Sequence, residues 1–118
     1  MTILGLNDID SLKLNINDYV IIGSAAAIAH GMPKTNSDLD VVIRDGISAY
    51  PVGILDICDH VLNGKISKTE IFRTSVVMAG YRYMGLLTLF KFYQILSQQT
   101  EKEKHVFAFH WLKAKTEK

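Results

Sequence analysis

Two aspartates placed two residues apart, Asp38 and Asp40, are the residues of this chain best suited to chemistry. Asp40 lies in the apolar run 39–43, which predicts a strand, and residues i and i+2 of an extended chain point to the same face. Such a pair can end a strand through turn hydrogen bonds. It can also share a divalent cation such as Mg²⁺ or Mn²⁺, which prefers oxygen ligands and leaves positions open for phosphate oxygens. The spacing therefore indicates phosphoryl chemistry on a nucleoside triphosphate.

A strand, a tight turn and a helix are expected before the aspartate pair. Residues 19–22 are apolar and β-branched, which predicts a buried strand. Gly23 would let a phosphate approach the backbone closely, and Ser24 can cap a helix that ends near Gly31. The first turn of a helix presents unpaired N–H groups to an anion. Gly23 and Ser24 are thus either a phosphate-binding turn or a simple N-terminal cap.

The combination of this turn with the acidic pair resembles the nucleotidyltransferase superfamily. The shared pattern is an apolar strand, Gly23-Ser24, a helix, and then Asp38-Leu39-Asp40 on the adjacent strand. The finer resemblance is to minimal nucleotidyltransferases of the antitoxin-like and abortive-infection type. It covers about residues 19–112. It implies transfer of a nucleotide from a nucleoside triphosphate to an acceptor hydroxyl on a protein, an RNA or a small molecule.

The resemblance also implies a role for each matching residue. Asp38 and Asp40 would bind Mg²⁺ or Mn²⁺ and act in catalysis. The expected contacts to the nucleotide come from one glycine, one serine and two lysines, namely Gly23, Ser24, Lys34 and Lys91. Lys91 lies in an amphipathic helical pattern, where a lysine that extends its charged end to solvent is the alternative interpretation.

A third carboxylate would serve as general base on the acceptor hydroxyl. Asp56 fills this role if residues 52–58 form a strand. The spacing of apolar residues also allows a helix over residues 54–62, and in that case Asp56 is a surface residue and Glu70 is the replacement. The resemblance favours the strand and Asp56.

The other expected elements complete an α/β (α+β) fold. A short helix is expected within residues 7–17, and further strands over residues 65–74 and 75–79. Apolar residues at helical spacing predict a helix over residues 85–98, and a second helix is expected over residues 101–113. The predicted fold is a small mixed β-sheet with helices packed on it, ending in two C-terminal helices.

Length and composition limit the function classes. The chain has 118 residues, 48% hydrophobic content, 21% charged content and a net charge of +1, which fits one domain over residues 1–118 and no broad basic surface. Its single cysteine, Cys58, excludes an internal disulfide framework and favours a reducing compartment. We therefore expect a cytoplasmic protein without a membrane anchor.

Two further interpretations remain open. The family's late Lys-Asp pattern appears here as Lys104-His105, without its acids, which suggests a catalytically degenerate antitoxin or regulatory protein that binds a protein partner. Nucleic-acid binding would depend on C-terminal lysines whose charge is diluted by interleaved glutamates. An exposed sheet edge and apolar terminal helices would allow a homodimer. The four histidines are too scattered to predict a metal site and are expected to be structural.

Overall fold

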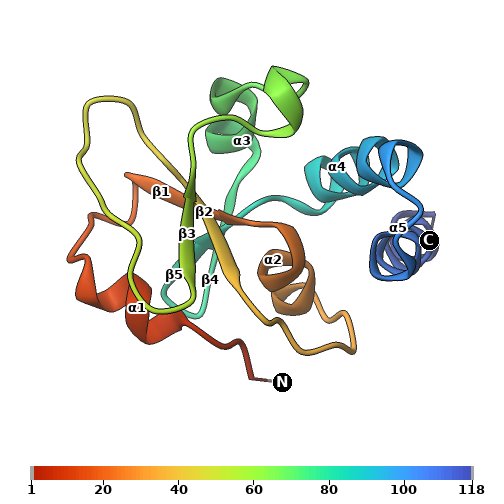
Figure 1. Cartoon of the computed structure of the whole chain (residues 1–118), viewed down its shortest axis with the longest axis horizontal. Coiled ribbons are helices and arrows are strands. Elements are labelled where there is room, and N and C mark those ends of the chain that lie inside the picture. The colour runs from red at the N-terminus through yellow and green to blue at the C-terminus, as the bar shows by residue number, and fades with distance from the viewer. Residues whose placement is uncertain (1, 118) are drawn as a thin grey trace.

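A mixed sheet with the strand order β3-β2-β1-β5-β4 forms the centre of the computed structural model, which describes residues 2–117 (Figure 1). Strand β1 pairs antiparallel with β2 and parallel with β5; β2 pairs parallel with β3, and β4 antiparallel with β5. The strands are Tyr19–Ile22 (β1), Leu39–Ile43 (β2), Leu55–Cys58 (β3), Val76–Met78 (β4) and Tyr81–Tyr83 (β5). The predicted α+β class with a mixed sheet is confirmed.

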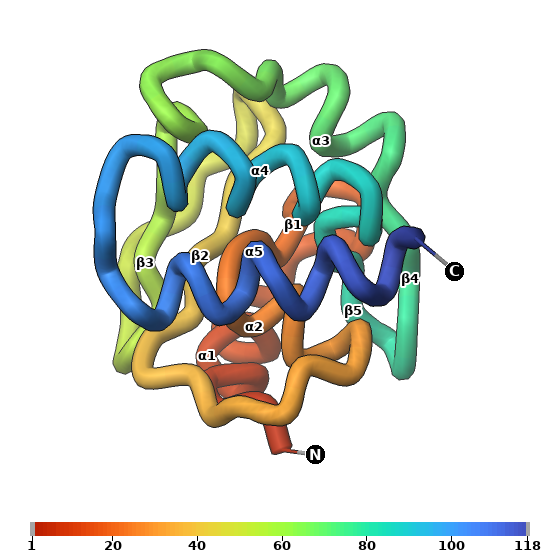
Figure 2. The backbone as a smooth tube through the Cα atoms, turned by 90° about the vertical axis from the view of Figure 1, so that its right-hand side faces the viewer, coloured from red at the N-terminus to blue at the C-terminus, as the bar shows by residue number. Residues whose placement is uncertain are grey.

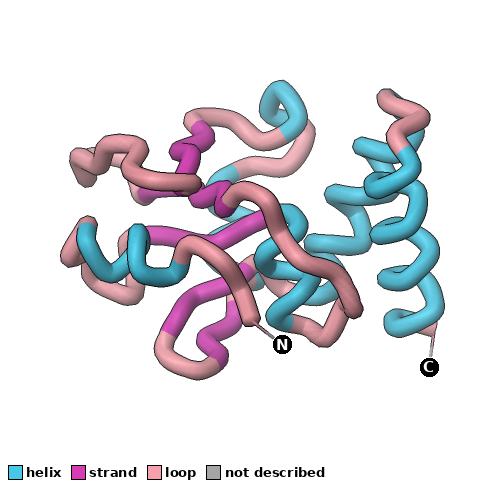
Figure 3. Tube along the Cα trace, turned by 60° about the horizontal axis from the view of Figure 1, so that its bottom comes forward, coloured by secondary structure: helices cyan, strands magenta, loops and turns pink. Residues whose placement is uncertain are grey.

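Helix α2 lies between the sheet and a pair of C-terminal helices (Figures 1 and 2). It contacts β1 and β2 on one side and α4 and α5 on the other. The α-helices are Leu6–Ser11 (α1), Gly23–Ala29 (α2), Lys68–Thr74 (α3), Leu86–Gln99 (α4) and Glu103–Thr116 (α5). Figure 3 shows the C-terminal helices gathered on one side of the molecule and the strands on the other. The two predicted C-terminal helices are therefore confirmed.

Small and β-branched side chains explain this layering. All four residues of β1 are buried, as are four of the five residues of β2. Three of the four alanines of α2, Ala25 to Ala27, are at most 1% exposed, so their small side chains let the helix approach the sheet closely. Each fully buried aliphatic side chain contributes roughly 1.5–3 kcal/mol to folding. This core fixes the β1–α2–β2 unit that carries the candidate site.

The strand expected over residues 65–74 is wrong. A short 3₁₀ turn, Leu62–Gly64, is followed there by helix α3. The side chain of Ser67 caps this helix by accepting a hydrogen bond of 3.1 Å from the backbone N–H of Glu70. Ser-x-x-Glu is a capping-box sequence, and this local signal outweighs the β-leaning residues around it. The hairpin instead uses Val76–Met78 and Tyr81–Tyr83, on either side of a turn at Ala79 and Gly80.

The alternative helix over residues 54–62 is also excluded, because Leu55–Cys58 forms strand β3. The connection from β2 to β3 contains no helix, although the two strands run parallel. It is a loop that begins at Arg44 and ends at Ile54. Within residues 2–117, no helix has both the length and the apolar character that a membrane crossing requires.

Candidate active site

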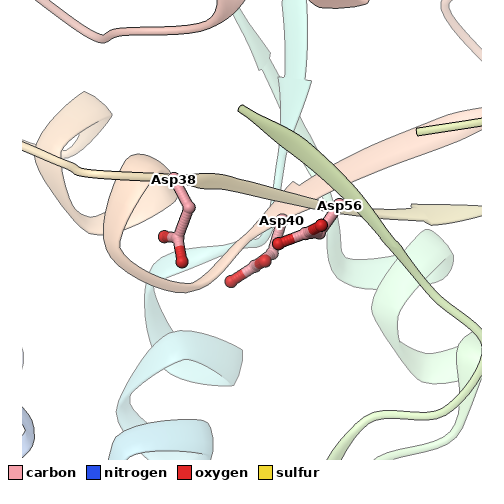
Figure 4. A group of neighbouring side chains, drawn as sticks. All are labelled: Asp38, Asp40 and Asp56. Carbon is pink, nitrogen blue, oxygen red and sulfur yellow. The ribbon is translucent and has the colours of Figure 1, made fainter. Parts of the chain in front are cut away.

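Three carboxylates converge where strands β2 and β3 begin (Figure 4). Asp40 and Asp56 are register partners across the parallel pair, which places their side chains on neighbouring strands and the same face. Asp38 lies two residues before Asp40, at the entry to β2. One oxygen from each of the three carboxylates lies within 4.8 Å of the other two. The third acid predicted from sequence is thus brought to the pair.

The pKa of the Asp40 carboxyl is raised. Burial raises its pKa to about 6, with smaller contributions from the negative charges of Asp38 and Asp56; Lys104 acts in the opposite direction. Both burial and like-charge repulsion disfavour the ionised carboxylate. The cluster therefore carries negative charge that the protein itself does not fully compensate.

A cleft of about 210 Å³ opens beside Asp38 and Asp40. One wall comes from the start of α2 and from the loop that leads into β2. The facing wall comes from the C-terminal half of α4 and the first turn of α5. The cleft thus has an acidic side, formed by the sheet and the start of α2, and a helical side, formed by α4 and α5.

Gly23 and Ser24 line the acidic side of the cleft, next to Asp40. Gly23 has φ +68°, a left-handed conformation that favours glycine, and a Cβ built on it would lie 3.6 Å from Asp40 Oδ2. The predicted N-terminal cap by Ser24 is wrong: α2 begins at Gly23, Ile22 occupies the cap position, and no side chain caps the helix. The Ser24 hydroxyl is consequently not committed to the helix terminus.

Asn36 holds the loop that presents Asp38, a role the sequence did not reveal. Its side chain is 2% exposed. The Nδ2 group donates to the carbonyl oxygens of Leu4 (2.8 Å) and Asp38 (2.9 Å), and Oδ1 accepts from the Leu4 N–H (2.9 Å). A fully bonded buried amide of this kind fixes backbone geometry. Asn36 therefore ties the entry of β2 to the N-terminal segment.

Two lysines flank the cleft from opposite directions. Lys34 lines it from the loop after α2, and its Nζ lies 4.3 Å from the centre of the Phe107 ring on α5. Lys104 lines it from the first turn of α5, close enough to Asp40 to lower the pKa of that carboxyl. Both can supply positive charge to an anionic ligand beside the acids.

Lys91 and Glu70 lie outside this arrangement. Lys91 Nζ and Glu70 Oε2 form an ion pair of 3.2 Å between α4 and α3, and neither residue lines the cleft. The structure therefore does not bring Lys91, expected to contact the nucleotide, to the acidic cluster. Glu70, the alternative third acid, is likewise not part of it.

Comparisons with known proteins do not bear on this geometry. Searches against protein-family models, curated proteins and solved structures return no match. The interpretation of the site therefore rests on the side chains described above.

Sequence reasoning missed the helical wall of the cleft. Helical spacing predicts Tyr93 and Leu96 only as part of the apolar pattern of residues 85–98, and His105 is expected to be structural, but all three line the cleft. The one available signal was the Lys104-His105 pair, which stands where the resemblance expects a lysine followed by an acid. Its position on the first turn of α5 brings both residues to the site.

Proposed function

We propose that this protein is a metal-dependent nucleotidyltransferase, which moves a nucleotide from a nucleoside triphosphate to an acceptor hydroxyl. The observation that carries the proposal is the approach of the Asp38, Asp40 and Asp56 carboxylates to within 4.8 Å beside a cleft that Gly23 also lines. The resemblance of the Gly23-Ser24 and Asp38-Leu39-Asp40 elements to nucleotidyltransferases supports the same reaction.

The donor set fits Mg²⁺ or Mn²⁺. It consists only of carboxylate oxygens, the ligands that hard divalent cations prefer. The raised pKa of Asp40 arises from burial and from its acidic neighbours, and a bound cation would relieve both effects. When bound, such a cation supplies charge neutralisation for the phosphate oxygens.

The residues of the cleft divide into roles by position. Gly23 and Ser24 face the acidic side and would hold the phosphates, while Lys34 and Lys104 would balance their charge. Asp56 is exposed and is the one acid of the cluster on the edge strand β3, so it would be placed to accept a proton from an incoming hydroxyl. Catalysis would come mainly from positioning and from preorganised charge.

The reaction balances with these groups alone. The acceptor oxygen forms a bond to the α-phosphorus, its proton passes to the Asp56 carboxylate, and the bond from the α-phosphorus to the bridging oxygen breaks. Pyrophosphate leaves with the electron pair of that bond.

The single cysteine fits a cytoplasmic setting, and burial raises the pKa of Cys58 to about 11, which keeps its thiol unreactive.

The direct experiment is incubation of the protein with α-labelled nucleoside triphosphates and Mg²⁺ or Mn²⁺, in the presence of cell extract as a source of acceptor. We expect pyrophosphate release and label transfer by the wild type and at least a hundredfold loss in Asp38→Asn and Asp40→Asn. Asp59→Asn, which removes a neighbouring exposed acid outside the cluster, is the matched control and should retain activity. Equal activity of the cluster variants and the wild type would reject the proposal.

Binding without transfer would separate the two interpretations that the sequence leaves open. If metal and triphosphate bind to the wild type and not to Asp40→Asn, yet no pyrophosphate is released, the chain is a degenerate member that retains only binding. Asp56→Asn provides a second check, because loss of transfer with retained binding is the signature of a missing base.

A further inference from the structure

The helical wall of the cleft contains two polar side chains, Tyr93 and His105, with hydrogen-bonding atoms available to a ligand. Besides Lys104, this wall consists of Phe92, Tyr93 and Leu96 from α4 and His105 from α5. It is mostly apolar, and it faces the acidic side where the phosphates would lie. Apolar surfaces interrupted by a few polar groups are typical of small-molecule sites.

The Tyr93 hydroxyl is the first of these groups. The Tyr93 side chain is 4% exposed, yet its hydroxyl makes no hydrogen bond to any residue between positions 2 and 117. Among residues 2–117, every fully buried side-chain nitrogen or oxygen has a hydrogen-bond partner. The Tyr93 hydroxyl has none, so it is not fully buried and opens into the cleft that Tyr93 lines. Burial, followed by the charges of Asp40 and Asp38, raises the pKa of Tyr93. A protonated donor thus sits close to the acids.

His105 is the second group. Its Nδ1 lies 2.7 Å from the hydroxyl of Thr100, at the C-terminal cap of α4, which leaves Nε2 as the ring nitrogen available to a ligand. Burial, with the charges of Lys104 and Lys102 nearby, lowers the pKa of His105, so the ring is neutral at physiological pH.

Tyr93 and His105 both come from the helices that line the cleft, whereas Gly23 and the acids belong to the sheet and the start of α2. The ring centres of Tyr93 and His105 are 6.3 Å apart, so one ligand in the cleft can contact both. A sugar carries hydroxyls that bond a tyrosine, and a base carries an apolar face together with polar edges that bond an imidazole. The acids and Gly23 on one side of the cleft and these groups on the other match a polyphosphate attached to a nucleoside.

We propose that Tyr93 and His105 are specificity residues that recognise the nucleoside part of the substrate by hydrogen bonds, with Phe92 and Leu96 covering its base. This inference rests on the proposed function, because the orientation follows from phosphates at the acidic end. It adds a reason for the chain to select nucleotides over other polyphosphates.

The test compares two ligands with the same phosphate content. Affinities for Mg²⁺-bound inorganic tripolyphosphate and for Mg²⁺-bound ATP, GTP, CTP and UTP are measured by calorimetry for each variant. We expect the wild type to bind at least one nucleotide tenfold more tightly than tripolyphosphate. Tyr93→Phe and His105→Leu should each weaken that nucleotide by roughly threefold to tenfold and leave tripolyphosphate unchanged.

Matched controls exist on the same chain. Tyr81→Phe removes a tyrosine hydroxyl that bonds Asp10 away from the cleft, and His110→Leu removes an exposed histidine from the same helix as His105. Both controls should bind nucleotides as the wild type does. Melting temperatures of all four variants confirm that each is folded under the binding conditions.

The possible outcomes distinguish a failure of the nucleoside subsite from a failure of the proposed function. Equal affinity of the wild type for tripolyphosphate and for every nucleotide, or unchanged nucleotide affinity in both Tyr93→Phe and His105→Leu, would overturn the nucleoside subsite alone. Absence of binding for tripolyphosphate and nucleotides alike would overturn both the subsite and the proposed function.

Discussion

Asp40 and Asp56 are direct partners in the parallel pairing of β2 and β3, and their carboxylate oxygens lie within 4.8 Å of each other. This pairing makes the acidic cluster a property of the sheet, because a shift of one residue in register would turn one carboxylate to the opposite face. It also brings like charges together at a partly buried position. The consequences for stability, metal affinity and ligand binding can each be measured.

Asp40→Asn should stabilise the metal-free protein at neutral pH. The pKa of Asp40 is raised from 3.8 to about 6 on folding. Between these values the folded state binds more protons than the unfolded state, so the free energy of unfolding falls as the pH rises. After allowance for solvent screening, we expect the free energy of unfolding of Asp40→Asn, measured in urea, to exceed that of the wild type by about 1–2 kcal/mol at pH 7.5 and to equal it at pH 3.5.

Asp45→Asn is the control, because its effect on the free energy of unfolding should have the opposite sign. The hydrogen bond and charge of Lys68 lower the pKa of Asp45, so this carboxylate stabilises the folded state above its unfolded pKa and loses that effect in acid. The variant should be slightly less stable than the wild type at pH 7.5 and equal to it in acid. A loss of stability in Asp40→Asn at pH 7.5 would refute the account of a strained acidic cluster.

Metal affinity should depend on pH in the range where Asp40 titrates. Below about pH 6 a proton competes with the cation for Asp40, so affinity should fall by up to about tenfold per pH unit. The melting temperature in excess Mg²⁺ or Mn²⁺ should therefore rise at pH 8 and change little at pH 5. A shift of equal size at both values would show that the cation binds elsewhere.

Gly23→Ala should impair ligand binding more than it impairs folding. Gly23 and Gly46 both have positive φ, +68° and +87°, so alanine at either position costs about 1–2 kcal/mol of stability. Only the Gly23 substituent approaches a site residue, since a Cβ at Gly46 meets nothing within 4 Å. Tripolyphosphate titrations should thus show weaker binding in Gly23→Ala and wild-type binding in Gly46→Ala. Equal binding in the two variants would remove Gly23 from the site.

Lys104→Met should weaken tripolyphosphate binding, and Lys91→Met should not. Lys104 lines the cleft beside Asp40, whereas Lys91 is paired with Glu70 outside it. Loss of one cleft lysine is expected to reduce affinity by about threefold to tenfold. The opposite ranking, with Lys91→Met the weaker binder, would restore the nucleotide contact that the sequence suggested for Lys91.

The local motifs at the site could be predicted because each has a strong short-range signal. The strand before Gly23, the alanine-rich helix after it and the strand of Asp40 follow from β-branched and helix-forming residues in sequence order. The placement of Asp56 depended on a choice between two periodicities that a short apolar run does not settle. Its parallel pairing with β2 decides the outcome, and pairing is a tertiary property.

The helical wall could not be predicted for a related reason. Periodicity shows which face of α4 is apolar, but it does not show that Tyr93 lines the cleft instead of filling the centre of the core. That depends on how α4 and α5 pack against α2. The Asn36 bridge to Leu4 joins segments 32 residues apart and likewise has no local signal. Helix α3 is different, since the sequence contains its Ser67–Glu70 capping box, and the strand prediction over residues 65–74 gave this local signal too little weight.

The most direct measurement is the anomalous diffraction of Mn²⁺ in crystals grown with tripolyphosphate. We predict a Mn²⁺ peak at ordinary coordination distance from Asp38 and Asp40, with phosphate density extending past Gly23 toward Lys104. Crystals of Asp40→Asn under the same conditions should lack the peak. Saturating Mn²⁺ that leaves the acidic cluster empty in the wild type, or that binds equally well in Asp40→Asn, would contradict the central claim that this cluster holds a catalytic cation.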